Sequence, residues 1–273
     1  MLRLETETGW WLVTHPDHAR LAGAIAARWG NAMFAEPEPR DRVLLGIGTH
    51  DDGWAVRDAH PSITKQGKPS AFSVELVGKY SAFEEIDLAD YLGVRERAVA
   101  EVAAKDAYAA LLVSMHTYNL LTARADRSTI SAEQLPLLDK FLEGQRELQQ
   151  KLFKAVQRDP QLSSDEVGRE AIEDGFRLLQ ATDNMSLLAC VDYAKKATLL
   201  HPLRLRGGGV SEVEVEPLGE RVFRLTPYPL DKDEVRIGFP ARFVEGKTFA
   251  SSADLEERFL AAGVVELELV LVR

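Results

Sequence analysis

The chain has 273 residues and a net charge of −10, with 45% hydrophobic and 28% charged residues. This composition is typical of a globular protein of one or two domains. The negative charge disfavours nucleic acid and anionic membranes as partners, and no apolar run approaches the roughly 20 residues of a membrane-spanning helix. The only cysteine, Cys190, excludes an intramolecular disulfide and a cysteine-based zinc cage. The first residues, MLRLETETGWW, do not resemble a signal peptide, so we expect a cytoplasmic protein.

The first hundred residues predict an extended segment, a helix and a long loop. GWWLVTH is rich in aromatic and β-branched residues, which favours an extended segment. Thr14 can cap a helix that runs to Gly30. The local propensity of RVLLGIG (42–48) favours a buried strand over a helix. Residues 55–95 carry several Pro and Gly with weak periodicity, which predicts a long ordered loop such as a lid or a binding loop.

The remaining chain divides near Pro202 to Gly209. Before this point, helical spacing covers about 96–125, about 132–158 and a stretch that opens with a cap near Ser163 and runs to about 198. After it, apolar residues alternate as in antiparallel strands, with a short helix, SADLEERFLAAG, before the last one. We therefore expect two domains, a helical one at 1–202 and a small antiparallel β subdomain at 203–273.

Three polar residues lie on apolar helical stripes and should point inward. They are His18, His116 and Asp183. A buried carboxylate must be paired, hydrogen-bonded or bound to a metal, although Asp183 can also pair with an arginine or face water. A lone inward histidine is more often a hydrogen-bonded core residue than a ligand. The segment THDDGW adds His50 and Asp51, which suit one zinc, iron or manganese ion, or form a simple turn.

The order His18, His50–Asp51 and Asp183 resembles the H…HD…D signature of the HD-domain superfamily. LLGIGTHDDGW matches the family pattern except at Asp52, where an apolar residue is usual, and Trp54, where Lys or His is common. A longer set of segments, WWLVTHPDHARLAGAIAARWG, HDDGW, RDAHP and GKPSAF, is similar to the DUF3891 family of HD-like proteins. The resemblance implies a mainly α, HD-domain-like helical bundle with a small C-terminal antiparallel β region, α+β overall, in which 42–48 is a helix.

The resemblance also implies a metal site and a function. The ligands would be His18, His50, Asp51 and Asp183, with His116 as an added ligand if a second ion binds, and the cofactor one or two divalent transition metal ions (Fe, Mn or Zn). The expected activity is a metal-dependent phosphohydrolase for a small phosphorylated or nucleotide-like substrate, acting through a metal-activated water. Asp52 or Asp58 would orient or deprotonate that water. Trp54, His60 and Lys65 are the expected substrate-binding residues.

Two other functions fit the same residues. One is an HD-type di-iron oxygenase of a small organic substrate, which needs His116 as an extra ligand. The other is a metal-binding or ligand-binding protein without turnover. The C-terminal sheet can serve as a homodimer or partner-binding module, or can simply cover one end of the bundle.

Overall fold

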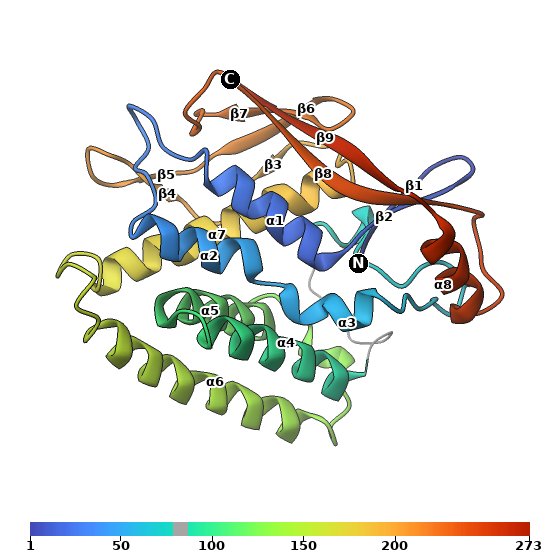
Figure 1. Ribbon diagram of the computed structural model, residues 1–273, viewed down its shortest axis with the longest axis horizontal. Coiled ribbons are helices and arrows are strands. Elements are labelled where there is room, and N and C mark those ends of the chain that lie inside the picture. The colour runs from blue at the N-terminus through green and yellow to red at the C-terminus, as the bar shows by residue number, and fades with distance from the viewer. Residues whose placement is uncertain (79–86) are drawn as a thin grey trace.

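The computed structural model describes residues 1–78 and 87–273 and is an α+β fold in layers (Figure 1). A curled mixed sheet lies against α1 and α7, the helices α2, α4 and α5 form the next layer, and α6 is outermost. The helices are α1 (His15–Ala26), α2 (Arg40–Thr49), α3 (Ala55–Asp58), α4 (Leu88–Ala103), α5 (Ala107–Thr122), α6 (Leu135–Val156), α7 (Arg169–Cys190) and α8 (Ser252–Ala261). Within the described ranges, no helix has both the length and the apolarity needed to cross a membrane.

The sheet has seven strands in the order β1-β2-β8-β9-β7-β6-β3. Its strands are β1 (Leu2–Glu5), β2 (Gly9–Val13), β3 (Ala197–Thr198), β6 (Glu214–Gly219), β7 (Val222–Thr226), β8 (Glu234–Glu245) and β9 (Val264–Val272), and β4 (Leu203–Arg204) with β5 (Val210–Ser211) forms a separate hairpin. The pairing of β7 with β9 is parallel, and the other neighbours are antiparallel.

The predicted mainly helical bundle with a small C-terminal β region is therefore wrong. The sheet is a full layer of the fold, and the first two strands of the chain belong to it. The sheet is larger than predicted because the extended segment GWWLVTH contains strand β2, which pairs with β8. This pairing runs from Gly9 opposite Glu245 to Leu12 opposite Arg242. The division into 1–202 and 203–273 stays a prediction, and backbone hydrogen bonds of the sheet cross it.

The first two helices form as expected and lie in close contact. The Thr14 hydroxyl accepts a hydrogen bond from the Asp17 amide at 3.2 Å, which caps α1. RVLLGIG lies within α2, so the helix implied by the family resemblance is confirmed against local propensity. A Cβ on Gly23 would lie only 2.9 Å from the Cα of Gly48, and one on Gly46 would lie 3.2 Å from the carbonyl oxygen of Ala109. Gly23 of α1 therefore permits close approach to α2, and Gly46 of α2 permits close approach to α5.

The later helices differ from prediction mainly at their ends. The helical stretch expected at about 96–125 is two helices, α4 and α5, and Asp106 caps the second by accepting from the Ala109 amide at 2.7 Å. The predicted loop 55–95 is shorter, since it contains α3 and α4 begins at Leu88; its residues 79–86 lie outside the described ranges. Glu166 accepts a hydrogen bond from the Ser163 amide, but α7 begins only at Arg169. The predicted helix 252–263 is confirmed as α8.

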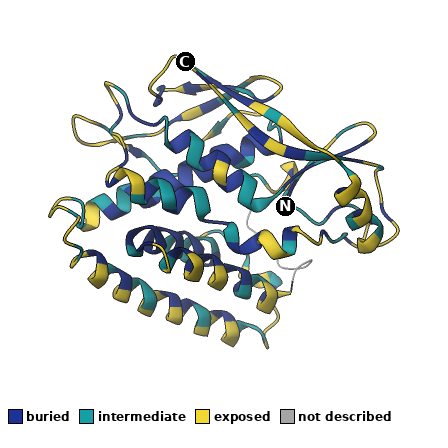
Figure 2. Ribbon diagram, in the orientation of Figure 1, coloured by how far each residue is buried: buried dark blue, intermediate teal, exposed yellow. Residues whose placement is uncertain are grey.

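The apolar core lies between the sheet and the helices. In Figure 2 the inner faces of α1, α5 and α7 are buried, while α6 exposes its outer face. A second small core at one end of β2 and β8 includes Trp10, Val244, Leu255 and Phe259, which tie α8 to the sheet. The helical layers thus leave α1, α2, α5 and α7 in mutual contact, and the polar residues of their inner faces must meet.

Candidate metal centre

Five predicted ligands meet at the junction of four helices. His18 lies on α1, His50 ends α2 and is followed by Asp51, His116 lies on α5, and Asp183 lies on α7. All five are buried, and none is more than 6% exposed. Two overlapping groups, His18–His50–Asp51 and His50–His116–Asp183, have one donor atom from each residue within 4.8 Å of the others. The structure thus brings together all five residues from positions up to 165 residues apart in the chain.

The donor atoms of the group face one another. His18 Nε2 lies 3.1 Å from Asp51 Oδ2, and His50 Nε2 lies 3.2 Å from Asp183 Oδ1. The His50 ring lies between the other two imidazoles, with centroid distances of 5.2 Å to His18 and 5.0 Å to His116. Three imidazole nitrogens and two carboxylates are a ligand set that suits zinc, iron or manganese. The buried His and Asp clusters can therefore hold a metal ion.

Partners outside the group orient the three imidazoles. His50 Nδ1 donates to the carbonyl oxygen of Ile47 at 2.7 Å. Since the Ser186 hydroxyl donates to the Asp183 carbonyl, its oxygen can accept from His18 Nδ1 at 3.0 Å. His116 Nδ1 lies 2.7 Å from the Gln180 side-chain amide, whose oxygen can accept from it after a half-turn of the amide. Each ring then has Nε2 left for a metal, as outer partners of metal-binding histidines commonly ensure.

The charges within the group are strongly coupled. Burial opposes protonation of His50, but Asp51 and Asp183 outweigh it and raise its pKa to about 9. Burial would raise the pKa of Asp51, yet Arg95 and the histidines hold that pKa well below its usual range. Burial lowers the pKa of His116 to about 3, so this ring is neutral at pH 7. Without metal, a proton on His50 balances part of the carboxylate charge.

Arg95 on α4 completes the group, and the sequence analysis did not find it. Its guanidinium contacts Asp51 Oδ1, and its Nε donates to the Tyr91 hydroxyl at 3.1 Å. It also lies over the rings of Trp54 and Tyr91, at 5.4 and 5.2 Å from their centroids. The residue is only 6% exposed. Its place on the apolar stripe of Leu88, Leu92 and Val99 was the signal, because an arginine there must have a buried partner.

A cavity of about 270 Å³ opens beside the metal-binding group. Its wall includes four of the five predicted ligands, so a small molecule inside it would reach the group. The rest of the wall is mainly apolar and aromatic, with two arginines. Its apolar and aromatic side chains include Trp54, Phe72, Leu76, Tyr91, Leu120 and Leu187, and one of the two arginines is Arg95. A mostly apolar wall with a few convergent polar groups is typical of small-molecule sites.

Two of the predicted catalytic and substrate residues line this cavity. They are Trp54 and Asp58, both buried. Asp58 accepts from the His15 backbone amide at 2.5 Å and lies 3.0 Å from the His15 Nδ1. His15, which the sequence analysis did not propose, also lines the cavity, and its ring stacks on Trp54 with the centroids 4.2 Å apart.

The cavity wall does not include the other three predicted catalytic and substrate-binding residues, Asp52, His60 and Lys65. Asp52 lies 3.5 Å from Arg20, on the side of the 3-10 helix η1 (Asp52–Trp54) that faces α1. His60 has a side chain that is 68% exposed and pairs with Glu256 of α8 at 2.8 Å. Lys65 is exposed in the loop before β-bridge residue Pro69. The structure therefore places Asp52, His60 and Lys65 outside the cavity wall, and their predicted roles stay predictions.

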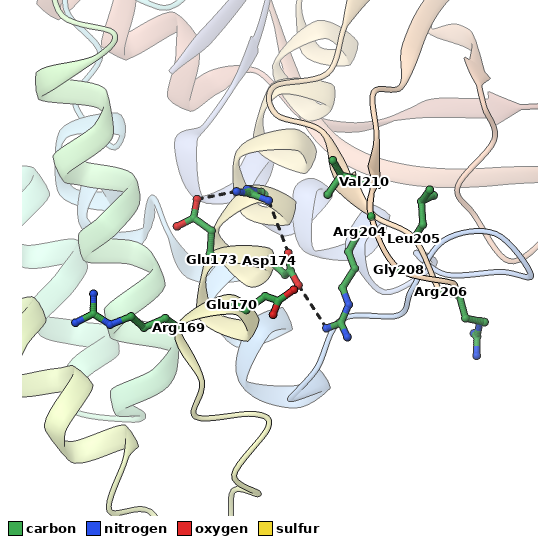
Figure 3. Close-up of a pocket in the computed structure, with 11 residues that line it drawn as sticks. Arg169, Glu170, Glu173, Asp174, Arg204, Leu205, Arg206, Gly208 and Val210 are labelled. Carbon is green, nitrogen blue, oxygen red and sulfur yellow. Dashed lines mark ion pairs between the residues drawn. The ribbon is translucent and has the colours of Figure 1, made fainter.

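A second cavity of about 540 Å³ lies between the N-terminal half of α7 and the β4–β5 hairpin (Figure 3). Four of its charged residues pair with one another: Arg204 reaches Asp174 at 3.4 Å, and Arg177 reaches Glu173 at 3.3 Å. It contains none of the predicted site residues. The compensated charges and the exposed position of Arg204 are typical of a solvated surface rather than a binding site.

Comparison with known families confirms the resemblance to DUF3891. Residues 1–246 match the model of a family described as a protein of unknown function, DUF3891. The chain belongs to the DUF3891 family. All five predicted ligands and Arg95 lie within the range matched to DUF3891. The match does not support the further assignment to the HD-domain superfamily. Comparisons of this DUF3891 chain with curated proteins and with solved structures returned no match.

Proposed function

We propose that the chain is a metal-dependent phosphohydrolase that cleaves a small phosphorylated substrate in the 270 Å³ cavity. The observation that carries this proposal is the convergence of three buried imidazoles and two buried carboxylates at the wall of that cavity. A bound divalent ion would lower the pKa of a coordinated water toward about 7 and polarise a phosphoryl oxygen.

Residues of the cavity wall can orient the attacking water and the substrate. Burial lowers the pKa of His15 to about 4, so its imidazole is neutral at pH 7 and can accept a hydrogen bond from that water. Asp58 fixes this ring through the contacts at its Nδ1 and its backbone amide, which makes Asp58 a positioning residue. Trp54 and Phe72 offer apolar surface to the organic part of the substrate.

The metal and the activity can be tested with one pair of variants. Asp183→Asn removes a predicted ligand, and Asp174→Asn changes a half-buried aspartate of the same helix that lies outside the metal-binding group. Loss of an outer partner of a metal ligand typically costs about 10–100-fold in metal affinity, so loss of a ligand should cost at least about 100-fold. We expect Asp183→Asn to lose bound metal and metal-dependent phosphate release, and Asp174→Asn to keep both.

Elemental analysis by mass spectrometry and phosphate release from a panel of phosphate monoesters provide the measurements. Metal content that is unchanged in Asp183→Asn would show that the site assignment is wrong. Bound metal without phosphate release from any ester would favour a binding protein without turnover. Two irons per chain together with oxygen consumption would favour the di-iron oxygenase instead.

A further inference from the structure

The two overlapping triads of the metal-binding group share His50. Its Nδ1 is engaged by the Ile47 carbonyl at 2.7 Å, so only Nε2 can bind a metal. One ring nitrogen binds one ion. The triads His18–His50–Asp51 and His50–His116–Asp183 therefore cannot hold two ions with three protein ligands each. Five residues can give each of two ions three protein ligands only if a carboxylate is shared between the ions.

Asp51 and Asp183 both face His18 and His50, and in Asp51 the second oxygen is already engaged. Oδ2 lies 3.1 Å from His18 Nε2 and 4.0 Å from His50 Nε2, whereas Oδ1 contacts the Arg95 guanidinium. Paired metal ions in enzymes lie about 3.5–4 Å apart, and a carboxylate that bridges them uses both oxygens. For Asp51 to bridge two ions, Arg95 would have to leave.

Arg95 is fixed in this position by its surroundings. The Tyr91 hydroxyl accepts from its Nε, the aromatic rings of Trp54 and Tyr91 lie against it, and only 6% of the residue is exposed. A guanidinium stays charged at any pH at which the protein is folded. The site thus has a permanent cation at the Asp51 oxygen that a second ion bridged by Asp51 would need.

The same guanidinium has donors left for a ligand. Within the described ranges, Nε donates to Tyr91 and Nη1 contacts Asp51, and no hydrogen bond is formed by Nη2. Arg95 also forms part of the cavity wall, next to four of the five predicted ligands. Guanidinium groups bind phosphoryl oxygens through two parallel hydrogen bonds, so this geometry suits a tetrahedral oxyanion.

We infer that the centre takes a single metal ion and that Arg95 takes the place of a second cation, so that a phosphoryl oxyanion in the cavity binds the ion and the Arg95 guanidinium together. This inference rests on the proposed function and names the way in which its substrate is held. Arg95 would then be a substrate-binding residue, with Tyr91 as its positioning residue.

The test uses metal stoichiometry and the binding of inorganic phosphate to the metal-loaded full chain by calorimetry. Arg95→Lys keeps the charge but lacks the two-pronged guanidinium. The matched control is Arg146→Lys, because Arg146 contacts Tyr118 in the same way as Arg95 contacts Tyr91. Arg146 donates to the Tyr118 hydroxyl at 2.8 Å and lies 5.2 Å from the centroid of the Tyr118 ring, and it is not part of the cavity wall. We expect one ion per chain in the wild type and in both variants. Phosphate affinity should fall at least about tenfold in Arg95→Lys, as for the loss of a hydrogen bond to a charged group, and stay within about twofold in Arg146→Lys.

The outcomes separate this inference from the proposed function. Two ions per wild-type chain would overturn the single-ion centre and leave the hydrolase proposal standing, whereas no bound ion would overturn both. Phosphate affinity that is equal in Arg95→Lys and wild type, or absent in both, would overturn the role of Arg95. If Arg95→Lys does not fold, Tyr91→Phe serves instead. We expect phosphate affinity to fall about threefold or more in Tyr91→Phe, because one hydrogen bond to Arg95 is lost. Unchanged phosphate affinity in this variant would overturn the role of Arg95.

Discussion

The charge of His50 links the metal-binding group to the stability of the metal-free protein. The ring is fully buried, which by itself disfavours the charged form, but Asp51 and Asp183 lie close enough to reverse that effect. Its pKa of about 9 in the folded chain exceeds the ordinary value of 6.5. A group that binds its proton more tightly in the folded state stabilises that state wherever it is protonated. A metal ion at Nε2 must displace this proton.

We predict that the metal-free protein loses stability as the pH rises from 6.5 to about 9. The contribution of His50 is fully present below its unfolded pKa and is lost as the pH passes its folded pKa. The difference corresponds to about 3 kcal/mol at 1.36 kcal/mol per pH unit. Urea unfolding in the presence of a chelator, between pH 6 and 9.5, measures it. The variant His50→Gln should show no such decline, and an equal decline in both proteins would contradict the prediction.

Several residues of the site could be predicted from the sequence, and others could not. His18, His116 and Asp183 lie on apolar helical stripes, and periodicity is enough to place such residues inward. Arg95 lies on a stripe of the same kind, but it falls at the end of the predicted loop 55–95, before the helix expected from about 96. His15 precedes the apolar stripe of α1, and its place in the cavity wall depends on contacts with Trp54 and with Asp58, 43 residues later.

At the scale of elements, the short 3-10 helix after Asp51 is held against α4. A Cβ on Gly53 would lie 2.4 Å from the carbonyl oxygen of Val94 and 2.6 Å from the amide nitrogen of Ala98. Both contacts are with backbone, which cannot move aside as a side chain can. This close packing keeps Asp51 next to Arg95, which lies between the two contacted residues. The close packing against α4 thus explains why the THDDGW segment has a glycine at position 53.

We predict that Gly53→Ala lowers the free energy of unfolding by about 1–3 kcal/mol, as overpacked core positions usually do. It should also weaken metal binding, because α4 and the segment carrying Asp51 must separate. The control is Gly93→Ala in α4, where a Cβ would meet nothing within 4 Å. Alanine is the better helix former, so this change should stabilise by about 0.5–1 kcal/mol. Urea unfolding and metal titration of Gly53→Ala and Gly93→Ala provide the test. An unchanged free energy of unfolding in Gly53→Ala would contradict the close packing of Gly53 against α4.

His60 and Lys65 lie outside the cavity wall although both follow Asp51 closely in the chain. His60 comes only nine residues after Asp51. The short helix α3 instead leads the chain out toward α8, where His60 meets Glu256, a partner 196 residues away. Local periodicity carries no information about such a contact, because it depends on how distant elements pack.

At the scale of the whole molecule, too, local sequence patterns do not show which distant elements pair. Alternation of apolar residues predicted the C-terminal strands, and aromatic and β-branched residues predicted β2, but neither shows which strand pairs with which. The pairing of β2 with β8 joins segments more than 220 residues apart and creates the large sheet that the sequence analysis missed. The central strand β9 lies beyond residue 246, where the DUF3891 match ends, and still separates β8 from β7.

We predict that a chain ending at residue 246 does not fold. It would lack α8 and β9, so β8 would lose its register partners from Glu234 to Arg242 and β7 its parallel neighbour. It would also lose Leu255, Leu269 and Leu271, which are fully buried. Removing a buried leucine side chain typically costs about 2–5 kcal/mol, so three together rival the whole stability of a domain, about 5–15 kcal/mol.

The control is Leu260→Lys in the full chain. Leu260 is an α8 residue that is 60% exposed, so this change should alter the free energy of unfolding by less than about 0.5 kcal/mol. Size-exclusion chromatography and urea unfolding would distinguish the two, and a monomeric truncated chain with a cooperative transition would show that the first 246 residues fold without the central strand.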